Sequence, residues 1–236
     1  MIILFNYGRM LGLPDPSPFV FKAELMLRMA NLPYELNDNG FNKAPKGKLP
    51  YITDDGVTVA DSLFIRFHIE QKYKINFDAR VSGERQAVLW AAERMVEEHL
   101  YHGVVRDRWV DDRNFNAGPA HYFGKVPSLI RPLVIKMVRG HMKKALKAHG
   151  MGRHSVAEIH RLCRADIGVL ASILGDRLYF GGDEPCGADA CFGAFITSLL
   201  CPVFESPLRD DLATHANLLA YSERMMARYF ADFVTR

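Results

Sequence analysis

The chain has 236 residues, of which 49% are hydrophobic and 24% are charged, and its formal net charge is +3. An intrinsically disordered chain would combine low hydrophobicity with high net charge, and a disulfide scaffold would need many more than four cysteines, so both classes are excluded. We therefore expect a globular protein with one large domain or two small ones.

The first part of the chain alternates between strand and helix patterns. Residues 2–7 form a short β-rich run, residues 19–30 place apolar side chains on one helical face, and residues 34–37 form a second short strand. The polar residues 38–48 fit either a short helix or a loop. This order predicts a β-α-β unit followed by a crossover.

A hairpin and a helix follow this unit. Two apolar runs, residues 49–53 and 57–60, flank an Asp-Asp-Gly sequence at 54–56, and an Asp-Gly pair between such runs indicates a tight turn. An amphipathic helix over residues 61–73 comes next. The whole region predicts a mixed α/β domain over residues 1–76.

Strand patterns nearly vanish after Gly83, and long helical periods replace them. We predict an all-helical second domain over residues 83–236, with a linker at 76–82. Residues 190–204 are strongly apolar but too short to cross a membrane, so we expect a buried helix and no membrane span. Residues 212–233 predict a last amphipathic helix. On the first long helix of this domain, we predict that one face carries Val88, Ala92, Met95 and His99.

Basic residues dominate the middle of the chain. Residues 114–157 contain eight lysine and arginine residues, from Lys125 to Arg153, and no acidic residue. Such a segment fits either a surface for an anionic partner or a solvated helix face. Because aromatic residues do not interleave with these charges, the solvated face is favoured and no nucleic-acid partner is expected.

The cysteines and histidines do not indicate a metal site. The four cysteines have neither CxxC spacing nor a histidine at zinc-finger spacing, and the pair His99 and His102 lacks a third ligand. The N-terminus has no basic region before its apolar start and no cleavage site of a signal peptide. We therefore expect a cytoplasmic protein without a metal.

Ser17 is the first candidate for chemistry. It precedes Pro18 at the start of the first predicted helix, where a serine oxygen can cap a backbone N–H and proline loses no hydrogen bond. The same terminus carries free N–H donors and the positive end of the helix dipole, so it can instead hold a thiolate beside the serine hydroxyl. Both interpretations fit the local sequence.

Two further candidates lie at the third strand and at the helix after the hairpin. Pro50 can simply begin a strand, but a cis peptide bond before it would expose the backbone of Leu49 for pairing with a peptide-like ligand. Asp61 and Ser62 can cap a helix, or they can bind the ammonium and carboxylate groups of an amino acid.

Together, these three sites on this order of strands and helices resemble the glutathione transferase superfamily over essentially the whole chain. The branch with the failed-axon-connections and metaxin-related proteins is most similar to the stretches SPFVFKAELMLRMANLPYE and KAPKGKLPYITDDGVTVADSLFIRFHIEQKY. The resemblance implies an α/β thioredoxin-like N-terminal domain followed by an all-α C-terminal domain.

The resemblance also implies a role for each candidate residue. Ser17 would donate a hydrogen bond to the thiolate of glutathione, the expected co-substrate, and Pro50 would be cis, so that Leu49 pairs with the cysteinyl unit. Lys48 would help to hold the tripeptide. Asp61 and Ser62 would bind the γ-glutamyl head group. The thiolate would then attack a small apolar electrophile.

This electrophile would lie between the two domains. Tyr7 at the end of the first strand, with Tyr101, Arg108 and Trp109 on the first long helix of the second domain, are candidates for its pocket, and interface packing explains these residues equally well. The resemblance also implies a homodimer. The alternative to an enzyme is a non-catalytic glutathione-binding or scaffold protein of the metaxin type.

Two features depart from the family's pattern. Residues 8–16 form a long connection between the first strand and the first helix, which could cover the site or move Ser17. In the second domain, Cys186 takes the place of the usual serine or threonine before the buried helix, although the aspartate three residues later, Asp189, is retained. The long connection would affect the catalytic role of Ser17, whereas the cysteine at the cap position would affect only the stability of the helix.

Overall fold

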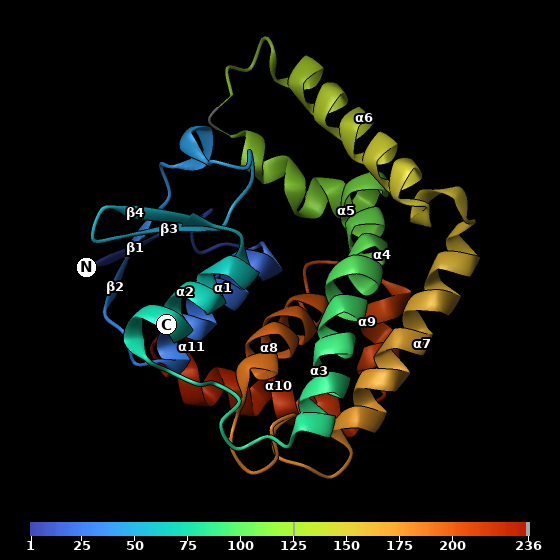
Figure 1. Cartoon of the computed structure of the whole chain (residues 1–236). Coiled ribbons are helices and arrows are strands. Elements are labelled where there is room, and N and C mark those ends of the chain that lie inside the picture. The colour runs from blue at the N-terminus through green and yellow to red at the C-terminus, as the bar shows by residue number, and fades with distance from the viewer. Residues whose placement is uncertain (125, 235–236) are drawn as a thin grey trace.

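Four strands form a sheet on one side of the molecule (Figure 1). The computed structural model describes residues 1–124 and 126–234. Strands β1 (Ile2–Phe5) and β2 (Tyr34–Asn37) are parallel, whereas β3 (Tyr51–Asp54) is antiparallel to β1 and to β4 (Val57–Ala60), in the order β2-β1-β3-β4. The predicted second strand is confirmed, and the first strand ends two residues earlier than predicted.

The hairpin between β3 and β4 turns at the predicted Asp-Gly pair. Asp55 has φ +48° and Gly56 has φ +83°, so both residues adopt the left-handed conformation that a two-residue hairpin turn requires. Strand β4 then leads through Asp61 into helix α2 (Ser62–Tyr73). The hairpin therefore delivers Asp61 and Ser62 to one edge of the sheet.

Helix α1 (Pro18–Met29) is buried along most of its length. It contacts α2 and α8 (Gly187–Leu199), and its polar side chains Lys22 and Glu24 are both 0% exposed. A helix enclosed on several sides has no single apolar stripe. The predicted apolar face of this helix therefore describes only part of its packing.

The remainder of the chain is mostly helical and lies beside the sheet (Figure 1), so the predicted α/β part followed by a helical part is confirmed. Its first element is a continuous rod over residues 83–110, while the division into domains 1–76 and 83–236 stays a prediction. The helices of this part are α3 (Gly83–Met95), the π turn η2 (Val96–Leu100), α4 (Tyr101–Val105), the π turn η3 (Arg106–Val110), α5 (Asp112–Ala117), η4 (Pro119–Phe123), α6 (Arg131–His149), η5 (Met151–Arg153), α7 (Val156–Leu174), α8, α9 (Pro207–Leu212), α10 (Ala216–Tyr229) and α11 (Ala231–Val234). A short 3-10 turn, η1 (Phe41–Lys43), lies in the polar stretch before β3.

Two details of the predicted helices are wrong. Residues 212–233 do not form one helix, because the chain turns near Thr214, whose hydroxyl donates to the Asp211 carbonyl, and again at Phe230. Val88 is 45% exposed rather than buried. The buried stripe of the rod runs instead through Leu89, Ala92, Glu93, Val96, Glu97 and Leu100. Its two glutamates explain the error, since a hydrophobic pattern does not count a carboxylate as buried.

Helix α6 carries most of the predicted basic segment and lies on the side of the molecule away from the sheet strands (Figure 1). Its lysines Lys136, Lys143, Lys144 and Lys147 are exposed, which fits a solvated helix face, while Lys125 lies outside the described residues. Across residues 1–124 and 126–234, no helix is long and apolar enough to cross a membrane.

Helix α8 is almost wholly buried, as predicted for the apolar stretch. The carboxylate of Asp189 in its first turn is 0% exposed and accepts hydrogen bonds from the backbone N–H groups of Cys186 (2.8 Å), Phe180 (2.9 Å) and Gly181 (3.0 Å). The retained aspartate thus fixes the loop before α8 and the start of the helix, despite the cysteine at the cap position.

Candidate functional site

Two hollows meet beside the N-terminus of α1. One has a volume of about 500 Å³ and the other about 450 Å³, and Tyr7, Ser17, Tyr101 and Met142 line both. We call the first the polar hollow, since Lys48, Asp61, Arg94 and Glu97 line it, and the second the aromatic hollow, since Phe41, Trp109, Tyr122 and Phe123 line it. Ser17 therefore faces both spaces at their junction.

The polar hollow brings together all five residues predicted to bind glutathione: Lys48, Leu49, Pro50, Asp61 and Ser62. They come from the loop before β3 and from the start of α2, two segments that the β3–β4 hairpin holds side by side. The backbone N–H of Asp61 donates to the carbonyl of Pro50 at 3.1 Å, which joins the two segments directly.

Asp61 has an unusual backbone conformation in this hollow. Its φ of +87° is rare for a residue with a side chain, and residues held in such conformations cluster at functional sites. Its carboxylate caps α2 by accepting from the Leu63 N–H at 3.1 Å, and it lies 3.1 Å from the Lys48 ammonium. Burial alone would raise the pKa of Asp61, but the Leu63 N–H and Lys48 together lower it, so this carboxylate stays ionised.

The peptide bond between Leu49 and Pro50 is cis, as the resemblance implied. Within the described part of the chain, neither the N–H nor the C=O of Leu49 forms a hydrogen bond to the protein. The Leu49 side chain is buried beside Val20 and Tyr51. Its backbone groups thus lie at the hollow with their hydrogen-bonding capacity unused, which suits pairing with an extended peptide-like ligand.

Ser17 precedes Pro18 at the start of α1, but its hydroxyl forms no capping hydrogen bond among the described residues. The interpretation of Ser17 as a side-chain cap is therefore wrong. The hydroxyl is instead free to donate at the positive end of a buried helix, where an anion is favoured.

The sequence analysis missed Asp15, which lies directly beneath Ser17. Its buried carboxylate accepts hydrogen bonds from the backbone N–H groups of Ser17 (2.8 Å) and Tyr7 (2.9 Å), and burial raises its pKa to about 7. An aspartate two residues before the N-cap of a helix, followed by proline, is a turn signal that could have identified it. Asp15 positions the backbone of Ser17.

The long connection over residues 8–16 does not cover Ser17. Arg9 binds the buried Glu24 through two hydrogen bonds of 2.6 and 2.7 Å and also donates to the Pro14 carbonyl at 2.7 Å. Leu13 packs against Cys201 and Phe204 of the helical part. This packing anchors the connection to α1 and to the loop after α8, so Ser17 keeps its place at the two hollows.

The helical rod supplies a wall of the polar hollow that the sequence analysis also missed. The side chains of Arg94, Glu97, Glu98 and His102 line it from one face of the rod. The His102 ring stacks on His149 of α6 with 3.6 Å between ring centroids, and burial, with the neighbouring histidine, lowers the pKa of His102. The spacing of these polar residues along one helix could have suggested a shared face.

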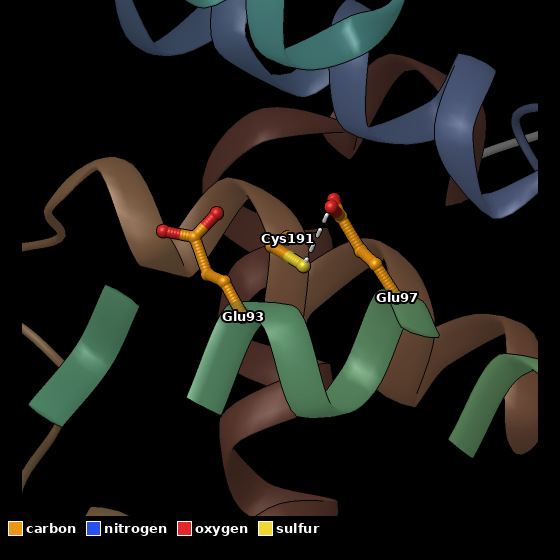
Figure 2. A group of neighbouring side chains, drawn as sticks. All are labelled: Glu93, Glu97 and Cys191. Atoms are coloured by element: carbon orange, nitrogen blue, oxygen red, sulfur yellow. Dashed lines mark hydrogen bonds between the residues drawn. The ribbon is translucent and has the colours of Figure 1, made fainter. Parts of the chain in front are cut away.

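Behind this wall lies a cluster of buried charges. The Lys22 ammonium of α1 contacts the carboxylates of Glu97 (2.7 Å) and Glu93 (3.0 Å). Figure 2 shows the two glutamates with Cys191 of α8, whose thiol lies 3.6 Å from Glu97. Glu93, Glu97 and Cys191 could together hold a metal ion, with ligand atoms within 4.8 Å of one another. Lys22 already supplies a cation to both carboxylates, so we read the group as an internal ion-pair cluster.

The four residues predicted for the electrophile pocket all line the aromatic hollow: Tyr7, Tyr101, Arg108 and Trp109. Tyr122 lies near two of them, with its ring centroid 6.4 Å from Tyr7 and 6.0 Å from Trp109. Burial, with the nearby Asp15 carboxyl, raises the pKa of Tyr7, so its phenol stays protonated at neutral pH. The sequence analysis missed Phe41, Tyr122 and Phe123, whose segments show no pattern that would bring them here.

Two family models match the chain: the glutathione S-transferase N-terminal domain over residues 18–114 and the glutathione S-transferase C-terminal domain over residues 163–225. Isoprene-epoxide–glutathione S-transferase of Rhodococcus sp. (strain AD45) is 30% identical, over 97% of this chain and 99% of that protein. Failed axon connections of Drosophila melanogaster is 31% identical over 99% of this chain, which spans only 59% of that protein. Metaxin-2 of Homo sapiens is 24% identical over 89% of this chain and 81% of that protein.

Solved structures show the same fold. The beta-etherase LigF from Sphingobium sp. strain SYK-6 superposes with a TM-score of 0.70 at 16% identity, over 99% of this chain and 98% of that one. A glutathione S-transferase of Ceriporiopsis subvermispora, solved in complex with glutathione, gives a TM-score of 0.64 at 17% identity over 98% and 97%. At these identities the likeness concerns the fold alone.

Proposed function

This chain belongs to the glutathione transferase superfamily, and on that premise we propose that it conjugates the thiolate of glutathione to a small apolar electrophile. The observation that carries the proposal is the free hydroxyl of Ser17, which stands at the start of α1 where the polar and aromatic hollows meet. A thiolate held there would contact a second substrate in the aromatic hollow without moving.

Glutathione would occupy the polar hollow. Its γ-glutamyl ammonium would bind the ionised Asp61, and its α-carboxylate would accept from Ser62 and the first N–H groups of α2. The cysteinyl unit would pair with the free backbone groups of Leu49. Lys48, which is 65% exposed and already contacts Asp61, would hold the tripeptide from the solvent side.

The Ser17 hydroxyl would donate a hydrogen bond to the thiolate and so favour ionisation of the glutathione thiol. The sulfur then attacks the electrophilic carbon: a C–S bond forms, and the bond to the leaving atom breaks with its electron pair on that atom. A small epoxide, as in the name of the Rhodococcus relative, fits this scheme. Its ring oxygen would take the electron pair and then a proton from water.

Conjugation of glutathione to a small epoxide and to an aromatic halide tests the proposal. We expect turnover by the wild type, a loss of about 10- to 100-fold in kcat for Ser17→Ala, and a higher glutathione Kd for Asp61→Ala by calorimetry. Ser128→Ala, which changes an exposed serine away from both hollows, is the matched control and should keep wild-type kinetics. Equal kcat for Ser17→Ala and wild type would refute the role of Ser17.

A non-catalytic glutathione-binding or scaffold protein is the second candidate. The buried Asp15 carboxyl beneath Ser17 favours it, because this group ionises as the pH rises through its pKa of about 7 and its negative charge then opposes a thiolate above it. The similarity to Failed axon connections and Metaxin-2 also supports it. Glutathione binding without conjugation across a panel of electrophiles would establish this alternative, whereas absence of glutathione binding would refute the glutathione site assigned under either candidate.

We also propose a homodimer in the cytoplasm. Large apolar side chains of α2 and α3 are exposed on one chain, namely Phe64 (53%), Phe67 (43%), Val88 (45%) and Trp90 (45%). Covering such side chains with a second copy would stabilise the pair. Sedimentation velocity should give twice the chain mass, and Trp90→Glu should give the monomer.

The cytoplasmic location rests on the four free, buried cysteines, which support a reducing compartment.

A further inference from the structure

Arg108 is a buried cation in the wall of the aromatic hollow. It lies on η3 and is 8% exposed, with its guanidinium carbon 4.3 Å from the ring centroid of Phe204 and one nitrogen donating to the Ser198 carbonyl. The carbonyl and the ring are both neutral. They orient the guanidinium but leave its charge uncompensated.

No carboxylate in the described part of the chain pairs with Arg108. The adjacent Asp107 is committed elsewhere: its oxygens lie 2.9 Å from His160, 2.6 Å from the Ser206 hydroxyl and 3.0 Å from Arg106. Two other buried cations of the molecule are treated differently, since Lys22 contacts two carboxylates and Arg66 contacts Glu70, Asp78 and Glu93. Arg108 is thus a buried arginine without an anion.

An unpaired buried charge is unfavourable, and buried charges in proteins are normally paired or bind a metal ion. Burial lowers the pKa of Arg108, but a guanidinium remains protonated at neutral pH. The other walls of the hollow are apolar or aromatic, from Val104, Val105 and Trp109 to Phe123 and Val138. The missing anion therefore has to arrive with the occupant of the hollow.

We propose that the aromatic hollow selects electrophiles that have an apolar body and one carboxylate, and that Arg108 is the counter-ion of that carboxylate. The inference rests on the proposed function, because it names the substrate class of the same site. An arginine guanidinium donates two parallel hydrogen bonds to a carboxylate, which gives orientation as well as affinity.

The helical rod gives the spacing between the two ends of such a substrate. Tyr101 lines both hollows next to Ser17, whereas Arg108 lines only the aromatic hollow, seven residues further along the rod. Seven residues correspond to roughly 10 Å along a helix axis. A substrate with one aromatic ring, its electrophilic carbon at Ser17 and its carboxylate at Arg108, would lie along this stretch of the rod within the hollow of about 450 Å³.

The test compares an acid with its uncharged analogue. For binding, calorimetry with 2-naphthoate and 2-naphthamide should give wild-type affinity at least tenfold higher for the acid, a preference that Arg108→Gln abolishes and Arg108→Lys partly retains. For turnover, 4-oxiranylbenzoate and its primary amide should show an acid-to-amide ratio of kcat/KM that falls at least tenfold in Arg108→Gln. Arg113→Gln, which changes an arginine with a 74% exposed side chain, is the matched control and should keep both preferences.

Each outcome separates this inference from the proposed function. Arg108-dependent binding of naphthoate with no conjugation of either epoxide would support the anion site and refute the transferase. Conjugation of both epoxides without a preference for the acid would support the transferase and refute the anion site. A wild type that binds naphthoate and naphthamide equally, or an Arg108→Gln protein that folds, binds glutathione and keeps the acid preference, would overturn the inference.

Discussion

Two buried cations sit in regions of opposite character. Beneath α1, the Lys22 ammonium contacts the carboxylates of Glu93 and Glu97, and these join the sheet part to the helical rod. In the aromatic hollow, Arg108 meets only a carbonyl and a phenyl ring. In the first region every buried charge has a partner of opposite sign, as in the interior of a domain. In the second region the buried cation gains such a partner only when a ligand binds.

The difference separates groups that hold the fold from groups that await a ligand. A buried charge with its partners in place is costly to disturb, because removing one partner leaves the other uncompensated. A buried charge without a partner has already incurred that cost in the folded protein. Stability measurements on matched substitutions at the two positions therefore distinguish the two kinds of region.

The largest effect is expected for Lys22→Met. This change removes the buried ammonium from two buried carboxylates and leaves Glu93 with Arg66 and Glu97 with Arg94, so the free energy of unfolding should fall by about 3–5 kcal/mol in urea denaturation at pH 7. Lys22→Met/Glu97→Gln should recover part of the loss. Lys143→Met, at an exposed lysine of α6, should stay within about 0.5 kcal/mol of wild type. A loss below about 1 kcal/mol for Lys22→Met would show that the paired Lys22 contributes no more to stability than the unpaired Arg108 is expected to.

The next effect concerns Asp15, a buried acid that is compensated by a proton. Its pKa of about 7 in the folded protein exceeds the ordinary value of 3.8, so the folded state binds this proton more tightly than the unfolded state. The resulting stabilisation is complete below pH 4 and is lost as the pH rises to 7, at about 1.4 kcal/mol per pH unit.

Comparison with Asp15→Asn isolates this dependence. The unfolding free energy of wild type minus that of the variant should fall between pH 4 and 7 and level off above pH 7, because asparagine does not titrate. Urea denaturation at half-unit pH steps measures it. Parallel curves for the two proteins would show that Asp15 has an ordinary pKa in the folded state.

The smallest effect on stability is expected for Arg108→Met. Because no carboxylate loses its partner, the free energy of unfolding should change by less than about 1 kcal/mol, or rise, although the hydrogen bond to Ser198 is lost. Thermal and urea denaturation beside Lys22→Met provide the comparison. A loss of 3 kcal/mol or more would show that Arg108 belongs to the structural charges.

Local patterns in the sequence were sufficient for the sheet part and its site. The Asp-Gly turn fixes the hairpin, and the hairpin fixes the distance between Pro50 and Asp61, so residues named from short motifs converge in one hollow. All ten candidate residues line one hollow or the other. Their roles stay predictions until glutathione binding and turnover are measured.

Features that depend on tertiary packing could not be predicted in the same way. Lys22 can be buried because it pairs with Glu93 and Glu97, which lie about 70 residues further along the chain. A pattern of apolar residues cannot predict such a pairing. The exposure of Val88 follows from the same cause, since these glutamates occupy the buried stripe. The partners of Asp15 are backbone N–H groups, so only the Asp-Pro turn signal before the first helix could have identified it.

The polar hollow has a thermodynamic consequence, because its walls belong to both parts of the chain. Lys48 and Asp61 come from the sheet part, whereas Arg94 and His102 come from the rod, so a ligand in the hollow acts as a clamp across the junction. By mass action, a ligand present at 100 times its Kd adds about 2.7 kcal/mol to the resistance against unfolding. Glutathione would then protect the chain from proteolysis as well as serve as a reactant.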